Sequence, residues 1–152
     1  MAAKKNGAEQ IGARVKTIKR AQLRPIGVIR SKLKRRGKAP RQGSEGAPDA
    51  WLDVELWASA GLQGVAIGHK ILVITWLHRG RRDVLRVRPQ SDRRRAMAGV
   101  FATRSPDRPN PLGLHAVTVR EIVGNRLKIE PMEAIDGTPV VDIKPVLSNL
   151  ER

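Results

Sequence analysis

Turn-forming residues divide this chain into short apolar runs, and this punctuation is what most limits its fold. The runs are rich in β-branched residues or alternate apolar with polar positions, as strands do. Gly, Pro, Asn and Asp separate them at intervals of roughly ten residues, a spacing typical of all-β sandwiches and barrels. We expect strands over residues 23–30, 51–56, 71–77, 84–88, 100–102, 117–123, 127–129 and 140–143, and a short helical turn over 58–68.

These elements predict a mostly-β protein, a single closed or partly closed β-barrel of short strands with one or two short helices. Gly124-Asn125 is expected to turn a hairpin between two of the strands. With 152 residues and 40% hydrophobic content the chain suits one domain with a buried core. We place that domain at residues 23–152, behind a basic and flexible N-terminal tail over residues 1–22.

Composition excludes several classes of site. The chain has no cysteine and only three histidines, which are scattered along it. A disulfide framework and a thiolate nucleophile are therefore excluded, and we predict no metal site because no ligand motif is present. No apolar run approaches the roughly 20 residues of a membrane span, and no secretory signal begins the chain. We expect a cytoplasmic protein without a membrane partner.

Positive charge is concentrated in two segments. The net charge is +16, from 30 Lys and Arg against 14 Asp and Glu. Residues 1–41 carry +13 and residues 79–95 carry +6, so the remaining residues are slightly acidic at −3. This distribution is typical of a protein that binds a polyanion such as RNA. The alternative is a solubilising tail and a solvated loop.

A proline-rich stretch offers the first candidate site residues. Three prolines within residues 106–111 fix φ and exclude a helix, which makes the segment over residues 104–113 a stiff loop. Such a loop could present Arg104 and Arg108 as planar donors for a carboxylate or phosphate. Alternatively, the two arginines pair with structural acids.

A concentration of acids lies nearer the C-terminus. Glu130, Glu133 and Asp136 fall within seven residues and could serve a cationic cofactor or a ribose diol. They could equally be the partners of Arg104 and Arg108. His78 ends the expected buried strand over residues 71–77, where its ring could reach a cleft or remain a structural histidine.

These two stretches together resemble the TsaA/TrmO family. The family motifs G-V-F-A-T-R-S-x-x-R-P-N-P-[IL]-G and D-G-T-P-V-x-D-I-K-P are both intact, from Gly99 and from Asp136. A third block begins at Pro25 and runs P-I-G-V-I-R-S, followed by P-R-Q from Pro40. A fourth is the strand that ends with Trp76 and His78. The resemblance covers about residues 24–147.

The resemblance implies a methyltransferase that uses S-adenosyl-L-methionine on a β-barrel, in keeping with the lack of a dinucleotide-binding glycine motif in this chain. It implies a homodimer with the cofactor near the subunit interface, and a tRNA substrate. The implied reaction methylates N6 of threonylcarbamoyl-adenosine at position 37. The matching positions that would hold the cofactor are Arg41, Gln42, Gly43, His78, Arg79, Arg104, Leu114, Glu130, Met132 and Glu133.

The same resemblance suggests which groups act on the proton. The carbamoyl group makes the N6 proton more acidic than in adenosine, and a nearby carboxylate or imidazole could remove it. Asp136 and His78 are the candidates. Lys32, Glu133 and Val146 depart from the usual family residues. The alternatives are a basic RNA-binding barrel without activity, or a methyltransferase for another nucleic acid or a small molecule.

Overall fold

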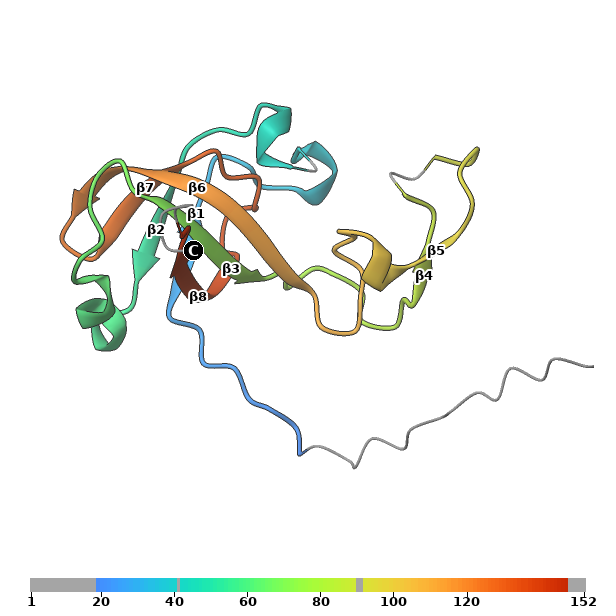
Figure 1. Cartoon of the computed structure of the whole chain (residues 1–152), viewed down its shortest axis with the longest axis horizontal. Coiled ribbons are helices and arrows are strands. Elements are labelled where there is room, and N and C mark those ends of the chain that lie inside the picture. Colours follow the sequence, from blue (N-terminus) through green and yellow to red (C-terminus); the bar gives the residue numbers. More distant parts are fainter. Residues whose placement is uncertain (1–18, 41, 90–91, 148–152) are drawn as a thin grey trace, which may run out of the picture.

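The structure, a computed structural model, describes residues 19–40, 42–89 and 92–147 (Figure 1). Its strands are β1 (Gly27–Arg30), β2 (Ala50–Val54), β3 (Lys70–Trp76), β4 (Arg86–Val87), β5 (Ala98–Gly99), β6 (Leu112–Val123), β7 (Arg126–Glu130) and β8 (Pro139–Pro145). Its helical segments are the 3-10 turns η1 (Arg36–Lys38), η2 (Gly43–Glu45), η3 (Leu56–Leu62) and η5 (Val100–Ala102). Most of the expected tail, and the candidate Arg41, lie outside the described residues.

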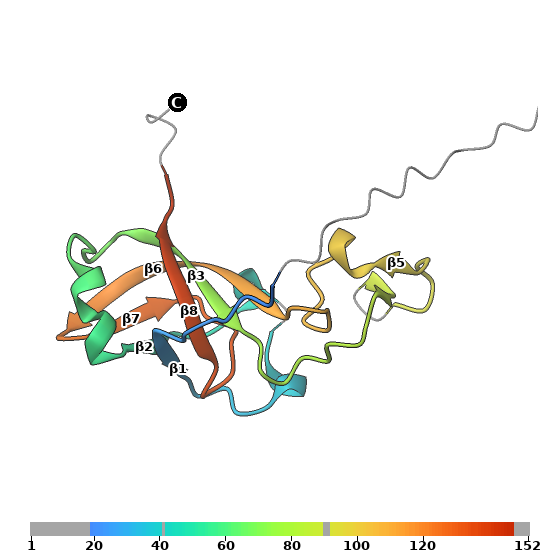
Figure 2. The same cartoon turned by 90° about the horizontal axis from the view of Figure 1, so that it is seen from below.

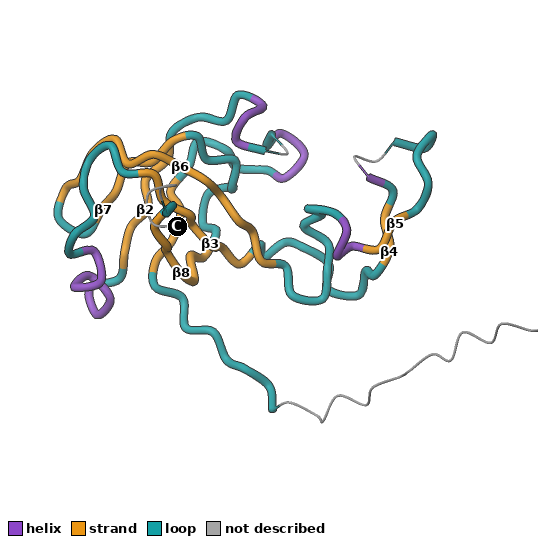
Figure 3. The backbone as a smooth tube through the Cα atoms, in the orientation of Figure 1, coloured by secondary structure: helices purple, strands orange, loops and turns teal. Residues whose placement is uncertain are grey.

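Six strands pair in a closed ring. Their order is β1-β2-β7-β6-β3-β8, and β8 returns to pair with β1 through Gly27 opposite Val140. Every neighbouring pair is antiparallel. The ring stands out as the cluster of orange segments in Figure 3. The expected mostly-β class is therefore confirmed, with a six-stranded sheet whose hydrogen bonding closes on itself.

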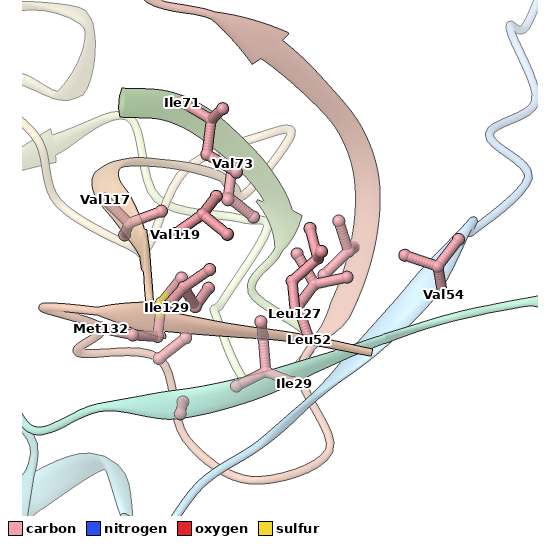
Figure 4. Close-up of a cluster of buried hydrophobic side chains, with 13 residues drawn as sticks. Ile29, Leu52, Val54, Ile71, Val73, Val117, Val119, Leu127, Ile129 and Met132 are labelled. Atoms are coloured by element: carbon pink, nitrogen blue, oxygen red, sulfur yellow. The ribbon is translucent and has the colours of Figure 1, made fainter. Parts of the chain in front are cut away.

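The core fills the inside of this ring, as the alternation of the strands requires. On β2, Leu52 and Val54 are buried while Trp51 and Asp53 face outward. Side chains from the other strands meet them in the centre (Figure 4). The fully buried ones are Ile29, Leu52, Val73, Val119, Leu127, Ile129, Met132 and Val140. These side chains belong to one hydrophobic cluster.

Several expected elements are shorter or longer than predicted, with β1 at Gly27–Arg30, β4 at Arg86–Val87 and η3 at Leu56–Leu62, and three differences affect residues of interest. Leu56 was expected on the buried face of a strand, but β2 ends at Val54 and Leu56 is exposed at the start of η3. Residues 100–102 form a 3-10 turn rather than a strand. The strand expected from residue 117 begins at Leu112, because residues 112–116 pair with β3 although Gly113 and the preceding prolines favour a loop. The hairpin at Gly124 is confirmed, with that glycine at φ 59.

Residues 81–89 and 92–111 lie outside the ring, and we call them the arm. It contains the small antiparallel pair β4–β5, where Arg86 lies opposite Gly99. Figures 1 and 2, at right angles to each other, both show this pair beside the ring and away from the core. Within the described ranges, none of the helices is long and apolar enough to cross a membrane.

Candidate functional site

The turn that follows β3 places His78 and Arg79 against the base of the arm. The Leu77 amide donates to the Pro111 carbonyl over 2.7 Å, and the Gly80 amide closes the turn onto Leu77 over the same distance. A Cβ on Gly80 would lie 2.5 Å from the Pro106 carbonyl oxygen, so only glycine permits this approach. The predicted His78 and the proline-rich loop are thus brought side by side.

Arg36 on η1 ties a third segment to this place. Its guanidinium donates to the Arg79 carbonyl over 3.2 Å and to the Asp107 carboxylate over 2.8 Å. Asp107 also accepts the Arg81 amide over 2.8 Å. Partial burial would raise the pKa of Asp107, but the bonds from Arg36 and Arg81 outweigh it and hold that pKa below its usual value. Asp107 therefore stays ionised and holds η1, the turn and the arm together.

The two loop arginines have different roles. Arg108 is half-buried and donates to the carbonyls of Val100, Thr103 and Ser105 over 2.8 to 3.2 Å. The expectation that Arg108 is presented to a ligand is therefore wrong, since its guanidinium is occupied by its own loop. Arg104 is exposed and makes no hydrogen bond or ion pair with the rest of the described chain. Of the two, Arg104 alone is available to an anionic group.

The three acids of the C-terminal stretch diverge, and none contacts Arg104 or Arg108. Glu130 accepts from Arg120 over 2.6 Å at the surface, and Glu133 pairs with His115 over 2.6 Å. Asp136 pairs with Lys34 over 3.0 Å. The alternative of a salt bridge between these acids and the loop arginines is therefore wrong.

A buried polar chain supports Glu133. His115 Nδ1 donates to Glu133 Oε1 over 2.6 Å, while Thr75 Oγ1 lies 2.7 Å from His115 Nε2. With Nδ1 donating to a carboxylate, Nε2 of the neutral ring accepts from the threonine hydroxyl. A Cβ on Gly113 would lie 2.5 Å from Thr75 Oγ1 and 2.7 Å from His115 Nε2. Glycine at position 113 therefore makes room for this chain of groups.

Gly43 brings the loop before β2 to the same carboxylate. A Cβ on Gly43 would lie 2.9 Å from Pro131 Cγ and 3.4 Å from Glu133 Oε2. Glu133 Oε2 itself receives no hydrogen bond from another described residue. Gly113 lies between His115 and Leu77, since a Cβ on it would be 2.7 Å from His115 Nε2 and 3.1 Å from Leu77 Cδ2. Gly43, Glu133, His115, Gly113 and Leu77 are therefore successive neighbours, and His78 follows Leu77 in the chain.

The other candidates lie apart from this series. The Met132 side chain is fully buried in the core, and its amide donates to the Pro48 carbonyl over 2.9 Å. Leu114 points outward from β6 and is 44% exposed. Gln42 is exposed beside Gly43. Glu130 is occupied by Arg120 on the outer face of the sheet.

Asp136 is committed to the loop that follows β1. Its carboxylate accepts the Ser31 amide over 3.0 Å, and its own amide donates to the Leu33 carbonyl over 2.7 Å. The Ser31 amide, and then the ammonium of Lys34, lower the pKa of Asp136. A carboxylate with a lowered pKa is a weak proton acceptor.

The pKa of His78 is lowered as well, but its ring is not bonded to other described groups as the Asp136 carboxylate is. His78 is exposed in the turn after β3 and has no hydrogen-bond partner in the described ranges. Partial desolvation of the ring, and then the charge of Arg79, lower the pKa of His78. Its imidazole is therefore neutral at neutral pH and free to accept a proton. The geometry favours His78 over Asp136 for that role.

Sequence reasoning missed His115 and Thr75 as parts of the site. His115 occupies an inward position of β6 between Gly113 and Val117, and Thr75 is the polar residue at an inward position of β3. A polar residue at an apolar position of an alternating strand is a signal that could have marked both. Among the described residues, no group of His, Asp and Glu is arranged to hold a metal ion.

The family model of the tRNA-methyltransferase O N-terminal domain matches residues 28–152. The chain belongs to this family. A probable S-adenosyl-L-methionine-binding protein of Archaeoglobus fulgidus is 44% identical over 130 residues, covering 86% of this chain and 35% of that protein. The tRNA (adenine(37)-N6)-methyltransferase of Escherichia coli is 35% identical over 135 residues, covering 83% of this chain and 57% of the enzyme.

The fold of this family member also matches a solved structure. TrmO from Pseudomonas aeruginosa superposes with a TM-score of 0.69 at 28% identity, over 85% of this chain and 57% of that one. The chain thus spans little more than half of the two bacterial proteins and about a third of the archaeal one. The residues that the family model matches contain both motif stretches.

Proposed function

We propose that this chain is a methyltransferase that uses S-adenosyl-L-methionine and acts on tRNA. The observation that carries the proposal is the series of neighbours from Gly43 through Glu133, His115 and Gly113 to Leu77, which precedes His78. It joins the separate motif blocks of a family whose Escherichia coli relative is named for methylating adenine 37 of tRNA. We propose N6 of threonylcarbamoyl-adenosine at that position as the acceptor, and the closed sheet as the family β-barrel.

The residues of this site suit the proposed cofactor. No described residue donates to Glu133 Oε2, which can accept from a ribose hydroxyl or an ammonium group. Gly43 packs closely against Pro131, where a side chain would collide, and this brings its backbone next to Glu133 Oε2. Arg104, whose guanidinium pairs with no described residue, can bind the carboxylate of the methionine part. When bound, the cofactor supplies an activated methyl group, so that alignment of the acceptor can provide much of the rate.

His78 is the proton acceptor in this proposal. The N6 proton is acidified by the carbamoyl group, and a neutral imidazole can remove it at neutral pH. Asp136 instead fixes the loop of Ser31 and Lys34 beside the site. His78 thus transfers the proton in this proposal, and Asp136 positions the neighbouring loop.

We also propose that the chain acts as a homodimer with the cofactor near the interface. Phe101 is 80% exposed on the arm, and Leu85 beside it is 63% exposed. The outward residues Leu112 and Leu114 at the start of β6 are also exposed. Exposed apolar side chains gathered in one region mark an interaction surface. A dimer by light scattering that becomes a monomer in Phe101→Ser supports this assembly, and a monomeric wild-type protein contradicts it.

A tRNA substrate also suggests roles for the two parts of the chain. We propose residues 23–152 as the methyltransferase domain and residues 1–22 as a basic tail that contacts tRNA in the cytoplasm. Removal of residues 1–22 should weaken tRNA binding and flatten its salt dependence, because fewer counterions are released. Cofactor affinity should stay the same, and an unchanged tRNA affinity contradicts a role for the tail.

Calorimetric titration with S-adenosyl-L-methionine tests the proposed function. We expect binding by the wild-type chain, weaker binding by Arg104→Ala, and wild-type binding by Lys70→Ala as a control on the far side of the sheet. An absence of binding heat for the wild type contradicts the methyltransferase and favours a non-enzymatic RNA-binding protein. Wild-type affinity in Arg104→Ala contradicts the assignment of Arg104.

A further inference from the structure

The outer face of β1, β2 and β7 carries a concavity that the proposed cofactor site does not use. Its volume is about 510 Å³, within the usual range for small-molecule and nucleotide sites. Asp136 borders it, whereas Gly43, Glu133 and Arg104 do not. The lining residues are Arg30, Ser31, Lys32, Lys34, Asp49, Ala50, Trp51, Lys128 and Asp136.

Strand register explains why these side chains meet. Arg30 is paired with Trp51 across β1 and β2, and Trp51 is paired with Lys128 across β2 and β7. Directly paired residues project from the same face, so the three side chains form one row on the outside of the ring. The loop of Lys32 and Lys34 rises from the end of this row. It is held there by Asp136, which accepts the Ser31 amide.

Positive charge is in excess in this concavity. Its two acids are each paired with a lining lysine, Asp49 with Lys128 over 3.6 Å and Asp136 with Lys34 over 3.0 Å. Lys32 is exposed and has no ion-pair partner in the described ranges. Arg30 reaches only Asp53, at 3.9 Å and outside the lining. The lining therefore has four cations against two acids, a net charge of +2, and Lys32 is the cation with no ion pair to a described residue.

Trp51 adds an apolar wall that is itself flanked by cations. The Arg126 guanidinium lies 4.7 Å from the centre of its ring, and the Lys128 ammonium lies 5.8 Å from it. Arg126 is anchored to Asp53 over 2.7 Å, which fixes the charge beside the ring. An aromatic wall within a row of cations is a combination that single-stranded nucleic acids favour.

We propose that this concavity binds the phosphodiester backbone of an RNA strand. S-adenosyl-L-methionine is a poor occupant, because its sulfonium cation would face an excess of positive charge. The proposal deepens the proposed function and rests on it for the identity of the polyanion, since the acceptor there is tRNA. RNA bound to Lys32 and Arg30 would lie next to Asp136, which also lines the concavity. Asp136 is three residues from Glu133, so the segment of residues 133–136 connects this concavity with the proposed cofactor site.

Charge reversal at Lys32 tests the proposal against a matched control. Binding of a short fluorescein-labelled single-stranded RNA is followed by anisotropy over a series of salt concentrations, for the wild type, Lys32→Glu and Lys70→Glu. Both variants change the net charge equally, but Lys70 lies at the start of β3, outside the concavity. We expect Lys32→Glu to weaken binding and lower the slope of log Kd against log salt by about 0.7 for each phosphate that is no longer neutralised. Equal weakening by both variants overturns the proposal.

Trp51 provides a local readout of the same event. In the full chain carrying Trp57→Phe and Trp76→Phe, Trp51 is the only remaining tryptophan. Saturating RNA should change its emission, and adding Lys32→Glu should require more RNA for the same change. Emission that stays constant at saturation overturns the proposal.

Cofactor titration of the same proteins separates this proposal from the proposed function. Lys32→Glu should bind S-adenosyl-L-methionine as the wild type does, which also shows that the variant is folded. If the wild type binds cofactor while RNA affinity is the same in Lys32→Glu and the wild type, the RNA site is wrong and the methyltransferase proposal stands. If the wild type binds RNA through Lys32 but binds no cofactor, the methyltransferase proposal is wrong and the RNA site stands.

Discussion

His115 donates from Nδ1 to Glu133 Oε1 over 2.6 Å, with the His115 side chain 4% exposed and the Glu133 side chain 15% exposed. The bond joins β6 to the segment after β7 and leaves Glu133 Oε2 facing Gly43. A carboxylate held in this way is fixed in orientation without losing its capacity to accept from a ligand.

Loss of the histidine donor should destabilise the fold. In His115→Leu the half-buried Glu133 carboxylate loses a charge-assisted hydrogen bond, and we expect the free energy of unfolding to fall by about 1–3 kcal/mol. His115→Asn, which keeps a donor near the Nδ1 position, should recover part of the loss. Urea unfolding at neutral pH measures the difference. A free energy for His115→Leu equal to that of the wild type contradicts the role of this bond.

Gly113→Ala should damage the same region by overpacking. Its Cβ would lie 2.5 Å from Thr75 Oγ1, so the Thr75–His115 contact must move, at a cost of about 1–3 kcal/mol. Gly61→Ala is the matched control, because its Cβ would meet nothing within 4 Å. Thermal unfolding should show a lower midpoint for Gly113→Ala alone. Equal midpoints for the two variants would be inconsistent with the packing described.

The Asp136 carboxylate should stabilise the fold at neutral pH and lose this effect in acid. Because the pKa of Asp136 is lowered in the folded chain, its contribution is complete above the ordinary carboxyl range and is lost as the pH falls through the folded pKa. Asp136→Asn should therefore be less stable than the wild type at neutral pH. The difference should shrink in acid, where the wild-type carboxylate is protonated too. Melting curves over a pH series test this, and a difference independent of pH contradicts it.

Substitution of Arg104 should affect cofactor binding, whereas substitution of Arg108 should affect the stability of the fold. Arg108→Ala removes bonds to three carbonyls of its loop and should lower the melting temperature. Arg104→Ala should leave the melting temperature unchanged and weaken S-adenosyl-L-methionine binding. The two variants remove the same charge, so each is the control for the other. If both lower the melting temperature alike, the distinct roles assigned to them are wrong.

The sequence predicted the parts of this protein that depend on alternation and turn chemistry. The buried positions Leu52 and Val54 and the hairpin at Gly124 follow from local pattern alone. The early start of β6 does not, because Gly113 and His115 look like loop residues until they are seen opposite Thr75 and Val73. Pairing between distant strands, rather than local preference, decides that element.

The candidate site was predictable in its residues but not in their partners. Arg104 and Arg108 are alike as sequence, and only the fold of the loop directs Arg108 onto its own carbonyls. Likewise, Asp136 is an acid of a functional motif, yet its bonds are to Ser31 and Lys34. Side-chain roles of this kind depend on contacts between segments that are far apart in the chain.

Methyl transfer to tRNA is the most direct test of the account. The wild-type chain is incubated with S-adenosyl-L-methionine labelled in its methyl group and with tRNA that carries or lacks the threonylcarbamoyl group. His78→Ala and Asp136→Asn are compared under the same conditions. The account predicts label in the modified tRNA alone, a large loss with His78→Ala and a smaller loss with Asp136→Asn. Wild-type protein that binds the cofactor but transfers no label to either tRNA would contradict it.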